Sequence, residues 1–174
     1  MIFVTVGMHS AGFERLVRAA DEMASFVEEA VIIQRGGTQY TPKFSEYFDF
    51  ADEVQMLDWL SRARVVVAHG GAGSILNTLQ AGKPLVVVPR LKRFGEVIDD
   101  HQMELAEALV RQGRTVAVTD LSSTTLWQAI EQITLPATPL GRMPAPRKLQ
   151  DVLRAWLVEQ SRSPAPWGLF GRRR

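Results

Sequence analysis

The clearest indication of the fold lies in the stretch Val65-Val-Val-Ala-His-Gly-Gly-Ala-Gly-Ser74. Its first four residues are apolar and mostly β-branched, which predicts a buried strand over 65–68. Three glycines follow, and apolar residues at helical spacing come next, which predicts a helix that ends near Gly82 and Pro84. A strand, a glycine-rich loop and a helix in this order are typical of an α/β fold.

Strands and helices alternate on both sides of this stretch. Short apolar runs predict further strands over 2–6, 30–34, 85–88 and 115–118. Helical periodicity predicts helices over 13–29, 56–63, 103–110 and 122–133, the last capped by Ser122. The segment 40–50, which mixes Pro42 with aromatic residues, fits neither pattern. Because the strands are continuously apolar, we expect a Rossmann-like parallel sheet with helices on both faces.

Polar and glycine-rich loops follow four of the predicted strands, at Gly7, Gly36, 69–74 and 89–102. The carboxyl ends of parallel strands meet at one edge of a sheet, so these loops should converge there. Ligands of such folds bind at that edge, where the strand order switches direction. The sequence therefore predicts one ligand site built from several loops.

The composition indicates one globular domain followed by a basic segment. The chain has 174 residues, of which 46% are hydrophobic and 22% charged, so it can bury a core. The formal net charge of +1 argues against a nucleic-acid-binding domain, although 8 of the 20 basic residues lie in 142–174. We expect a ligand-binding domain over 1–135, a proline-rich linker and an amphipathic helix over 136–160, and a flexible basic tail over 161–174.

The absence of cysteine excludes a disulfide framework and cysteine-ligated metal sites. No apolar run approaches the length needed to span a bilayer, and the start of the chain lacks the pattern of a signal peptide. We therefore expect a cytoplasmic chain. The aromatic and arginine residues from Trp156 onward leave two alternatives open: contact with an anionic membrane or a partner, or packing of the last helix on the sheet.

The loop 69–74 is suited to binding a phosphate. Its glycines allow close approach of the backbone, and the N-terminus of the following helix offers free N–H groups to an anion. The loop matches neither the P-loop nor the dinucleotide fingerprint. A tight turn without a ligand is the alternative. His69 could contact a phosphate or form an ordinary hydrogen bond at the end of its strand.

The run 69–90, followed by Asp100-His-Gln102, resembles the C-terminal nucleotide-sugar-binding domain of family 28 (MurG-type) glycosyltransferases. The opening 2–7 and the segment 13–17 resemble the small donor-binding subunit of split members of this family. Such subunits occur in the eukaryotic dolichol-linked N-acetylglucosaminyltransferase and, as PssE- or EpsF-like proteins, in bacterial exopolysaccharide assembly. The resemblance covers about 1–118 and implies the fold of the C-terminal half of a GT-B glycosyltransferase.

This resemblance implies a site for a UDP-sugar donor. It places the ribose at Asn77, where the family usually has an acidic residue that binds the diol more strongly. Asp99 or Asp100 could also act as an ordinary helix cap. The resemblance places the diphosphate at Gly70, Gly71, Ala72, Gly73 and Ser74. It places the donor sugar at Asp100, His101 and Gln102. Gly7 and His69, at the ends of two predicted strands, are further candidates for donor binding.

The loop 89–96 carries further candidates. Arg90, Lys92 and Arg93 could neutralise a diphosphate or pair with the carboxylate of a uronic acid donor. Glu96 could bind a sugar hydroxyl or pair with an arginine. A solvated surface loop is the alternative for this segment.

The resemblance further implies an inverting hexosyltransferase that acts only with a second, membrane-anchored subunit. That partner would bind a lipid-linked acceptor and supply the general base, so the chain would lie at the inner face of the membrane. His9 is the base candidate within the chain. We expect neither a metal nor a cofactor besides the UDP-sugar substrate. The alternative of another class is a non-catalytic nucleotide-sugar-binding module that regulates or scaffolds polysaccharide assembly.

Overall fold

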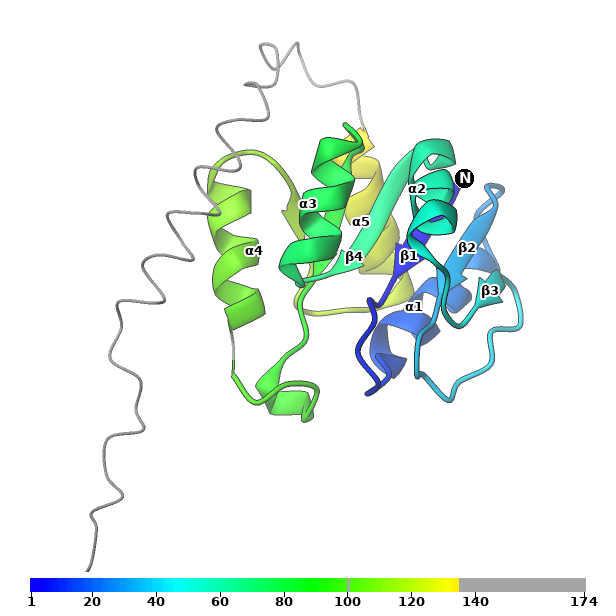
Figure 1. Ribbon diagram of the computed structural model, residues 1–174, viewed down its shortest axis with the longest axis horizontal. Coiled ribbons are helices and arrows are strands. Elements are labelled where there is room, and N and C mark those ends of the chain that lie inside the picture. The colour runs from blue at the N-terminus through cyan, green and yellow to red at the C-terminus, as the bar shows by residue number, and fades with distance from the viewer. Residues whose placement is uncertain (100, 135–174) are drawn as a thin grey trace, which may run out of the picture. The chain divides into compact units, whose positions relative to one another are not determined.

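A six-stranded parallel sheet is formed by the residues that the computed structural model describes, 1–99 and 101–134 (Figure 1). The strand order is β3-β2-β1-β4-β5-β6, and all five neighbouring pairs are parallel. This order confirms the predicted Rossmann-like sheet. The strands are β1 (Ile2–Thr5), β2 (Val31–Gln34), β3 (Glu46–Phe48), β4 (Val65–His69), β5 (Leu85–Val88) and β6 (Val116–Ala117).

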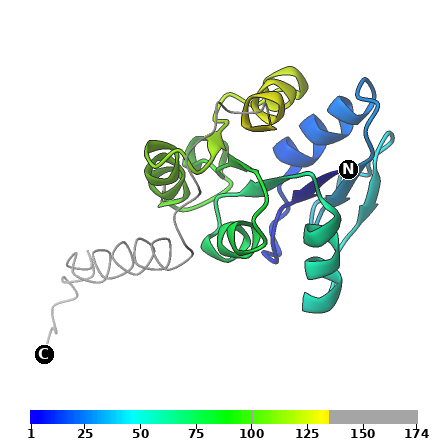
Figure 2. The ribbon, with the colours of Figure 1, turned by 90° about the horizontal axis from the view of Figure 1, so that it is seen from above.

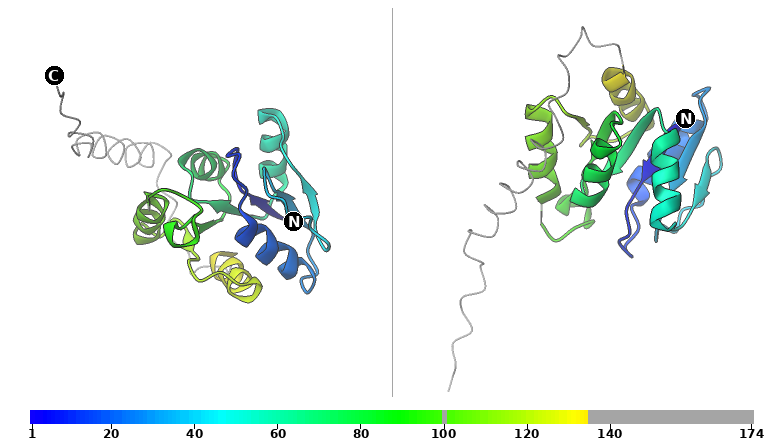
Figure 3. Two further views of the ribbon diagram at one scale, coloured as in Figure 1. Left: turned by 90° about the horizontal axis from the view of Figure 1, so that it is seen from below. Right: turned by 45° about the horizontal axis from the view of Figure 1, so that its top comes forward.

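Helices cover both faces of the sheet, as Figures 2 and 3 show: α1 and α5 lie on one face, and α2 and α3 on the other. Helix α4 contacts the edge strand β6. A short 3₁₀ helix, η1, lies in the loop after β5. The bounds are α1 (Glu14–Ala24), α2 (Glu53–Arg62), α3 (Ala72–Gln80), η1 (Lys92–Phe94), α4 (His101–Arg111) and α5 (Ser123–Thr134).

Successive side chains of each strand point to opposite faces, so each central strand contributes side chains to the core on both faces of the sheet. On the first face, Val4 and Val67 are buried with Leu16 of α1 and Leu126 of α5. On the second face, Phe3, Phe48 and Trp59 form a stacked aromatic cluster with ring centroids 5.9–6.4 Å apart. This aromatic cluster joins β1 and β3 to α2, which positions α2 beside the carboxyl ends of the strands.

Several elements differ from the sequence prediction, and α1 ends at Ala24 rather than near 29. Strand β3 lies in the segment without a clear pattern, because Glu46 and Tyr47 are exposed at the edge of the sheet and no apolar run marks the strand. Helix α2 begins three residues earlier than predicted, because Asp52 caps it and accepts a hydrogen bond from Gln55 N at 2.8 Å. The predicted cap of α5 is confirmed, since Ser122 Oγ accepts from Thr125 N at 3.1 Å.

The loop before β3 is held by a buried carboxylate. Asp21 of α1 is 0% exposed and accepts hydrogen bonds from the backbone N–H groups of Lys43, Phe44 and Ser45. Burial by itself raises the pKa of the Asp21 carboxyl, but these amides and the hydroxyls of Tyr40 and Ser45 outweigh it and lower the pKa below its ordinary value. This tether compensates for the short pairing of β3.

The chain divides into a unit of Met1–Pro136, which contains every described residue, and a second unit of Ala137–Arg174. The predicted linker and helix over 136–160 and the basic tail over 161–174 lie outside the described residues. Within the described part, no helix has both the length and the apolar character required to cross a bilayer.

Candidate functional site

The strand order switches direction between β1 and β4, and a cavity of about 490 Å³ lies at the carboxyl ends of these strands. The polar loops that follow the strands surround it, as the sequence predicts for a parallel sheet. Helices α2 and α3 form its sides. The cavity is lined by Thr5, Gly7, Met8, Gln34, Ala51, Glu53, Met56, Leu57, Leu60, His69, Gly71, Gly73, Ser74, Asn77 and Thr78.

One wall of the cavity is the glycine-rich loop and the first turn of α3. Gly71 is the N-cap residue, and no side chain among the described residues caps this helix terminus with a hydrogen bond. The first turn contains no acidic residue. An alanine Cβ at Gly73 would meet no heavy atom within 4 Å, so the space beside this residue is open. The wall therefore presents unpaired backbone N–H groups and the positive end of the helix dipole to an anion.

The opposite wall is apolar and comes from the loops after β1 and β3 and from α2. It consists of methionine, leucine and alanine side chains, with Glu53 at the first turn of α2 adding a carboxylate. A cavity with one amide-rich wall and one apolar wall fits a ligand that joins a phosphate to a planar, weakly polar group. The apolar side chains are Met8, Ala51, Met56, Leu57 and Leu60.

His69 lies at the centre of the site with its imidazole between Gly7 and Gly71. A Cβ on either glycine would collide with the imidazole ring, and Gly7 also has a positive φ of 79°. Burial, followed by the charge of Arg90, lowers the pKa of His69 to about 4. The imidazole is therefore neutral at pH 7. Its Nδ1 atom is buried without a hydrogen-bond partner among the described residues.

Gln34 is a cavity residue that the sequence analysis missed. Its Oε1 accepts hydrogen bonds from Thr5 Oγ1 at 2.7 Å and from Gly7 N at 3.1 Å. Its Nε2 donates to the carbonyls of Gly7 and Asp49, both at 3.0 Å. One buried amide thereby joins the end of β2 to the loops after β1 and β3. A polar residue that ends an apolar strand was the available signal for it.

Arg90 has a different place from the one that the sequence suggests. Its side chain is buried, and its guanidinium donates to the carbonyl of Gly12 at 2.7 Å and to that of Val6 at 3.3 Å. Burial lowers the pKa of Arg90 from its ordinary value. Because Arg90 does not line the cavity and its donors bind backbone carbonyls, this geometry gives no support to its predicted contact with a diphosphate. It instead joins β5 to the loop after β1.

Glu96 pairs with Arg15, which is one of its two predicted alternatives. Arg15 Nε donates to Glu96 Oε1 and Arg15 Nη2 to Glu96 Oε2, both at 3.0 Å. Glu96 Oε2 also accepts from Leu91 N at 2.9 Å. Lys92 and Arg93 are exposed on η1, and Arg93 Nη2 donates to the carbonyl of Thr119 at 3.3 Å. None of these residues lines the cavity.

The predicted donor-sugar residues precede and begin α4. Asp100 lies outside the described residues. His101 is exposed, and its backbone N–H, the first of the helix, donates to Asp99 Oδ1 at 3.2 Å. Gln102 Oε1 accepts from Arg90 N at 3.1 Å, and a Cβ at Gly70 would lie 2.6 Å from Gln102 Cβ. Gln102 therefore supports the glycine-rich loop from behind.

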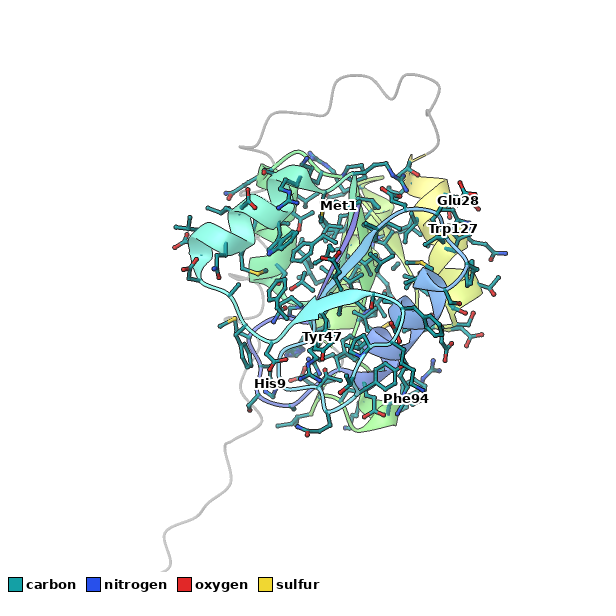
Figure 4. The ribbon with its side chains drawn as sticks, turned by 90° about the vertical axis from the view of Figure 1, so that its right-hand side faces the viewer. Met1, His9, Glu28, Tyr47, Phe94 and Trp127 are labelled. Atoms are coloured by element: carbon teal, nitrogen blue, oxygen red, sulfur yellow. The ribbon has the colours of Figure 1, made fainter. Side chains whose placement is uncertain are left out.

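His9, the base candidate, lies in the loop after β1 and outside the set of cavity-lining residues. It is exposed, and its Nδ1 accepts a hydrogen bond from Ala11 N at 3.1 Å. Figure 4 shows it at the edge of the sheet opposite Met1. Among the residues that the structure describes, no three His, Cys, Asp or Glu side chains gather to hold a metal ion. The expectation that no metal is needed stays a prediction.

Comparison with known proteins assigns the family. Residues 1–155 match the model of the glycosyltransferase family 28 C-terminal domain. The chain belongs to this family. A human protein, UDP-N-acetylglucosamine transferase subunit ALG13, is 32% identical over 161 residues, which are 86% of this chain and 13% of that protein. The ALG13 subunit of the yeast Debaryomyces hansenii is 32% identical over 99 residues, which cover 56% of this chain and 44% of the relative.

Solved structures of family 28 relatives and other glycosyltransferases share the fold. The NMR structure of an ALG13 protein has a TM-score of 0.57 at 20% identity and covers 87% of this chain and 94% of that one. The crystal structure of the glycotransferase of kitacinnamycin has a TM-score of 0.65 at 21% identity and covers 91% of this chain. This chain spans 42% of the kitacinnamycin enzyme, and therefore less than half of that protein and of both curated relatives.

Proposed function

We propose that this chain is the donor-binding part of a glycosyltransferase that uses a UDP-sugar. The observation that carries the proposal is the cavity at the strand switch point, which combines the uncapped N-terminus of α3 with an apolar wall. Family membership supports a nucleotide-sugar ligand. The names of the ALG13 relatives make UDP-N-acetylglucosamine the first donor to test.

The two walls suit the two halves of a nucleoside diphosphate. The diphosphate would accept hydrogen bonds from the N–H groups of Ala72, Gly73 and Ser74, and the uracil would lie against the apolar wall. Asn77 on the next turn of α3 would hydrogen-bond the ribose hydroxyls. Neutral His69 would contribute a hydrogen bond rather than a charge, so the helix dipole carries most of the anion binding.

Transfer would proceed with inversion. An acceptor hydroxyl loses its proton to a base as its oxygen attacks the anomeric carbon, and the bond between that carbon and the diphosphate breaks. The departing UDP takes the electron pair, and the first turn of α3 stabilises the new charge. This route needs neither a metal nor a further cofactor.

The base and the acceptor site would come from a second protein. His9, the base candidate of this chain, lies outside the set of cavity-lining residues, and the relatives are named as subunits. We propose a membrane-anchored partner that binds a lipid-linked sugar acceptor, with this chain held at the cytoplasmic face of the membrane. Exopolysaccharide assembly is the process that we propose for the complex.

A second candidate function rests on Asn77. A neutral amide in place of a carboxylate forms weaker hydrogen bonds with a ribose diol. A chain that binds nucleotide-sugars weakly and catalyses no transfer would fit a regulatory or scaffold module. Transfer of sugar by the chain together with its partner would exclude this alternative.

The proposal is tested by calorimetric titration of the full chain with UDP, UDP-N-acetylglucosamine and NAD. We expect binding of both uridine compounds and none of NAD. Ser74→Ala should weaken the binding of UDP, because Ser74 lines the cavity at the first turn of α3. The Gln80→Ala variant, on the same helix and outside the set of cavity-lining residues, is the control. Failure of both uridine compounds to bind would contradict the proposal.

A further inference from the structure

Two helix N-termini border the cavity of the candidate site, and they differ in charge. At α3, no side chain among the described residues caps the helix, and the first turn has no acidic residue. At α2, Asp52 accepts a hydrogen bond from Gln55 N at 2.8 Å, and Glu53 adds a second carboxylate in the first turn. An anion therefore favours the side of the cavity at α3, and a group that donates hydrogen bonds favours the side at α2.

Glu53 belongs to a stripe of side chains along α2. Positions 53, 56, 57 and 60 share one side of this helix because they are separated by about one or two turns. All four side chains line the cavity. The other three, Met56, Leu57 and Leu60, are apolar. The side of α2 that borders the cavity is therefore an apolar surface with one carboxylate at its N-terminal end.

The Glu53 carboxylate is available to a ligand. It is exposed, and its side chain makes no hydrogen bond or ion pair within the described part of the chain. Asp52, and not Glu53, caps the helix. Among the described residues that line the cavity, Glu53 is the one acidic side chain, and none is a lysine or an arginine. A ligand in the cavity therefore meets one carboxylate that has open acceptor positions.

Charge and position decide which part of a nucleoside diphosphate meets Glu53. The carboxylate would repel the diphosphate, which favours the bare N-terminus of α3. The ribose is placed by Asn77, which lies on α3 and not on α2. The nucleobase remains, because it would lie against the apolar stripe that Glu53 ends, and an N–H group at its edge can donate to a carboxylate.

We propose that Glu53 is a specificity-determining residue that accepts a hydrogen bond from an N–H group of the nucleobase, which is N3–H in the case of uracil. This inference rests on the proposed function, which places the base on this wall. A methyl group on N3 of uracil removes the donor. Guanine presents two adjacent N–H donors and would bind the carboxylate with both.

Calorimetric titration of the full-length chain tests the proposal with UDP, N3-methyl-UDP, 2′-deoxy-UDP and GDP. The forms compared are the wild type, Glu53→Ala, Glu53→Gln and the control Glu104→Ala. Glu104 is an exposed acidic residue in the first turn of α4 and does not line the cavity. The quantity compared is the ratio of the Kd for N3-methyl-UDP to the Kd for UDP.

This ratio separates base recognition from a structural role. An acidic residue in a first turn also stabilises its own helix, but that effect acts on all ligands equally and cancels in the ratio. We expect the wild type and Glu104→Ala to bind UDP about tenfold more tightly than N3-methyl-UDP. In Glu53→Ala the ratio should fall close to one. Glu53→Gln should lie between, because its amide oxygen can still accept the hydrogen bond.

Two results would overturn the proposal while the donor site stands. The first is a ratio that Glu53→Ala leaves at its wild-type value, or that is already close to one in the wild type. The second is a preference for UDP over 2′-deoxy-UDP that disappears in Glu53→Ala, because Glu53 would then contact the ribose.

Other outcomes concern the proposed function. Failure of the wild type to bind any of these nucleotides would contradict the donor site and this inference with it. Binding of GDP more tightly than UDP, with a preference that Glu53→Ala removes, would support Glu53 as the base-recognising residue and contradict the uridine donor.

Discussion

Substituting Gly73 by alanine separates the stability of the fold from its affinity for a nucleotide. Gly73 lies in the first turn of α3 and has no positive φ. An alanine Cβ there would meet no heavy atom within 4 Å. The substitution therefore creates no clash, and it removes the flexibility of a helical glycine. We expect Gly73→Ala to stabilise the fold by about 0.5–1 kcal/mol, which corresponds to a rise of roughly 1–4 °C in Tm.

The effect on binding should have the opposite sign. The new methyl group would occupy open space at the wall where we place the diphosphate. Loss of one hydrogen bond to a charged group costs about 1.5–3 kcal/mol. We therefore expect the Kd for UDP to rise roughly 10- to 100-fold.

The assay combines thermal unfolding with calorimetric titration of the same protein. Gln80→Ala is the matched control, because Gln80 is exposed in the last turn of α3 and does not line the cavity. It should raise Tm slightly and leave the Kd for UDP unchanged. A Gly73→Ala variant that binds UDP as tightly as the wild type would refute the placement of the diphosphate on this turn.

Three further predictions follow from buried or cavity-lining groups. Arg90→Ala should destabilise the fold by more than about 2 kcal/mol in urea unfolding, because the Arg90 guanidinium donates to two backbone carbonyls. Arg93 is exposed, so the control Arg93→Ala should change stability by less than about 0.5 kcal/mol. Equal losses of stability in the two variants would argue against a structural role of Arg90. The low pKa of His69, about 4, means that only the unfolded chain takes up this proton between pH 6.5 and 4, so stability should fall by about 2 kcal/mol from pH 7 to pH 5. His69→Gln should remove this fall and His9→Gln should keep it; a fall that survives His69→Gln would assign it to another group. Asn77→Ala should weaken UDP about fivefold and 2′-deoxy-UDP hardly at all, and equal losses for the two ligands would place the ribose elsewhere.

The sequence predicts the sheet well because its central strands are buried on both faces. Val65 to Ala68 and Leu85 to Val88 are continuous apolar runs, so the pattern alone marks them. Strand β3 could not be predicted from an apolar pattern, because its residues are exposed at an edge of the sheet and its position depends on Asp21, which is distant in the sequence. The start of α2 could not be predicted from apolar spacing either, since the cap residue Asp52 determines where that helix begins.

The residues of the candidate site also fall into two groups, those that a local sequence pattern predicts and those that it does not. Glycine-rich loops and helix termini have local signatures, so the amide-rich wall at Gly71, Gly73 and Ser74 could be predicted. The roles of Gln34 and Arg90 depend on carbonyls up to 84 positions away in the chain, and no local pattern shows whether a polar side chain is buried. The apolar wall from α2 was missed for a related reason, because its side chains carry no chemical signature of binding.

Binding of the nucleotide in the switch-point cavity is tested by a ¹H–¹⁵N correlation spectrum of the full-length chain, recorded during titration with UDP. We expect saturable shift changes in the backbone amides of Gly71, Gly73, Ser74 and Asn77, which line the cavity. The amides of Glu107 to Val116, which border a different groove beside β6, should stay unchanged. No shift change in the first turn of α3, or changes confined to that other groove, would contradict the claim that the switch-point cavity binds the nucleotide.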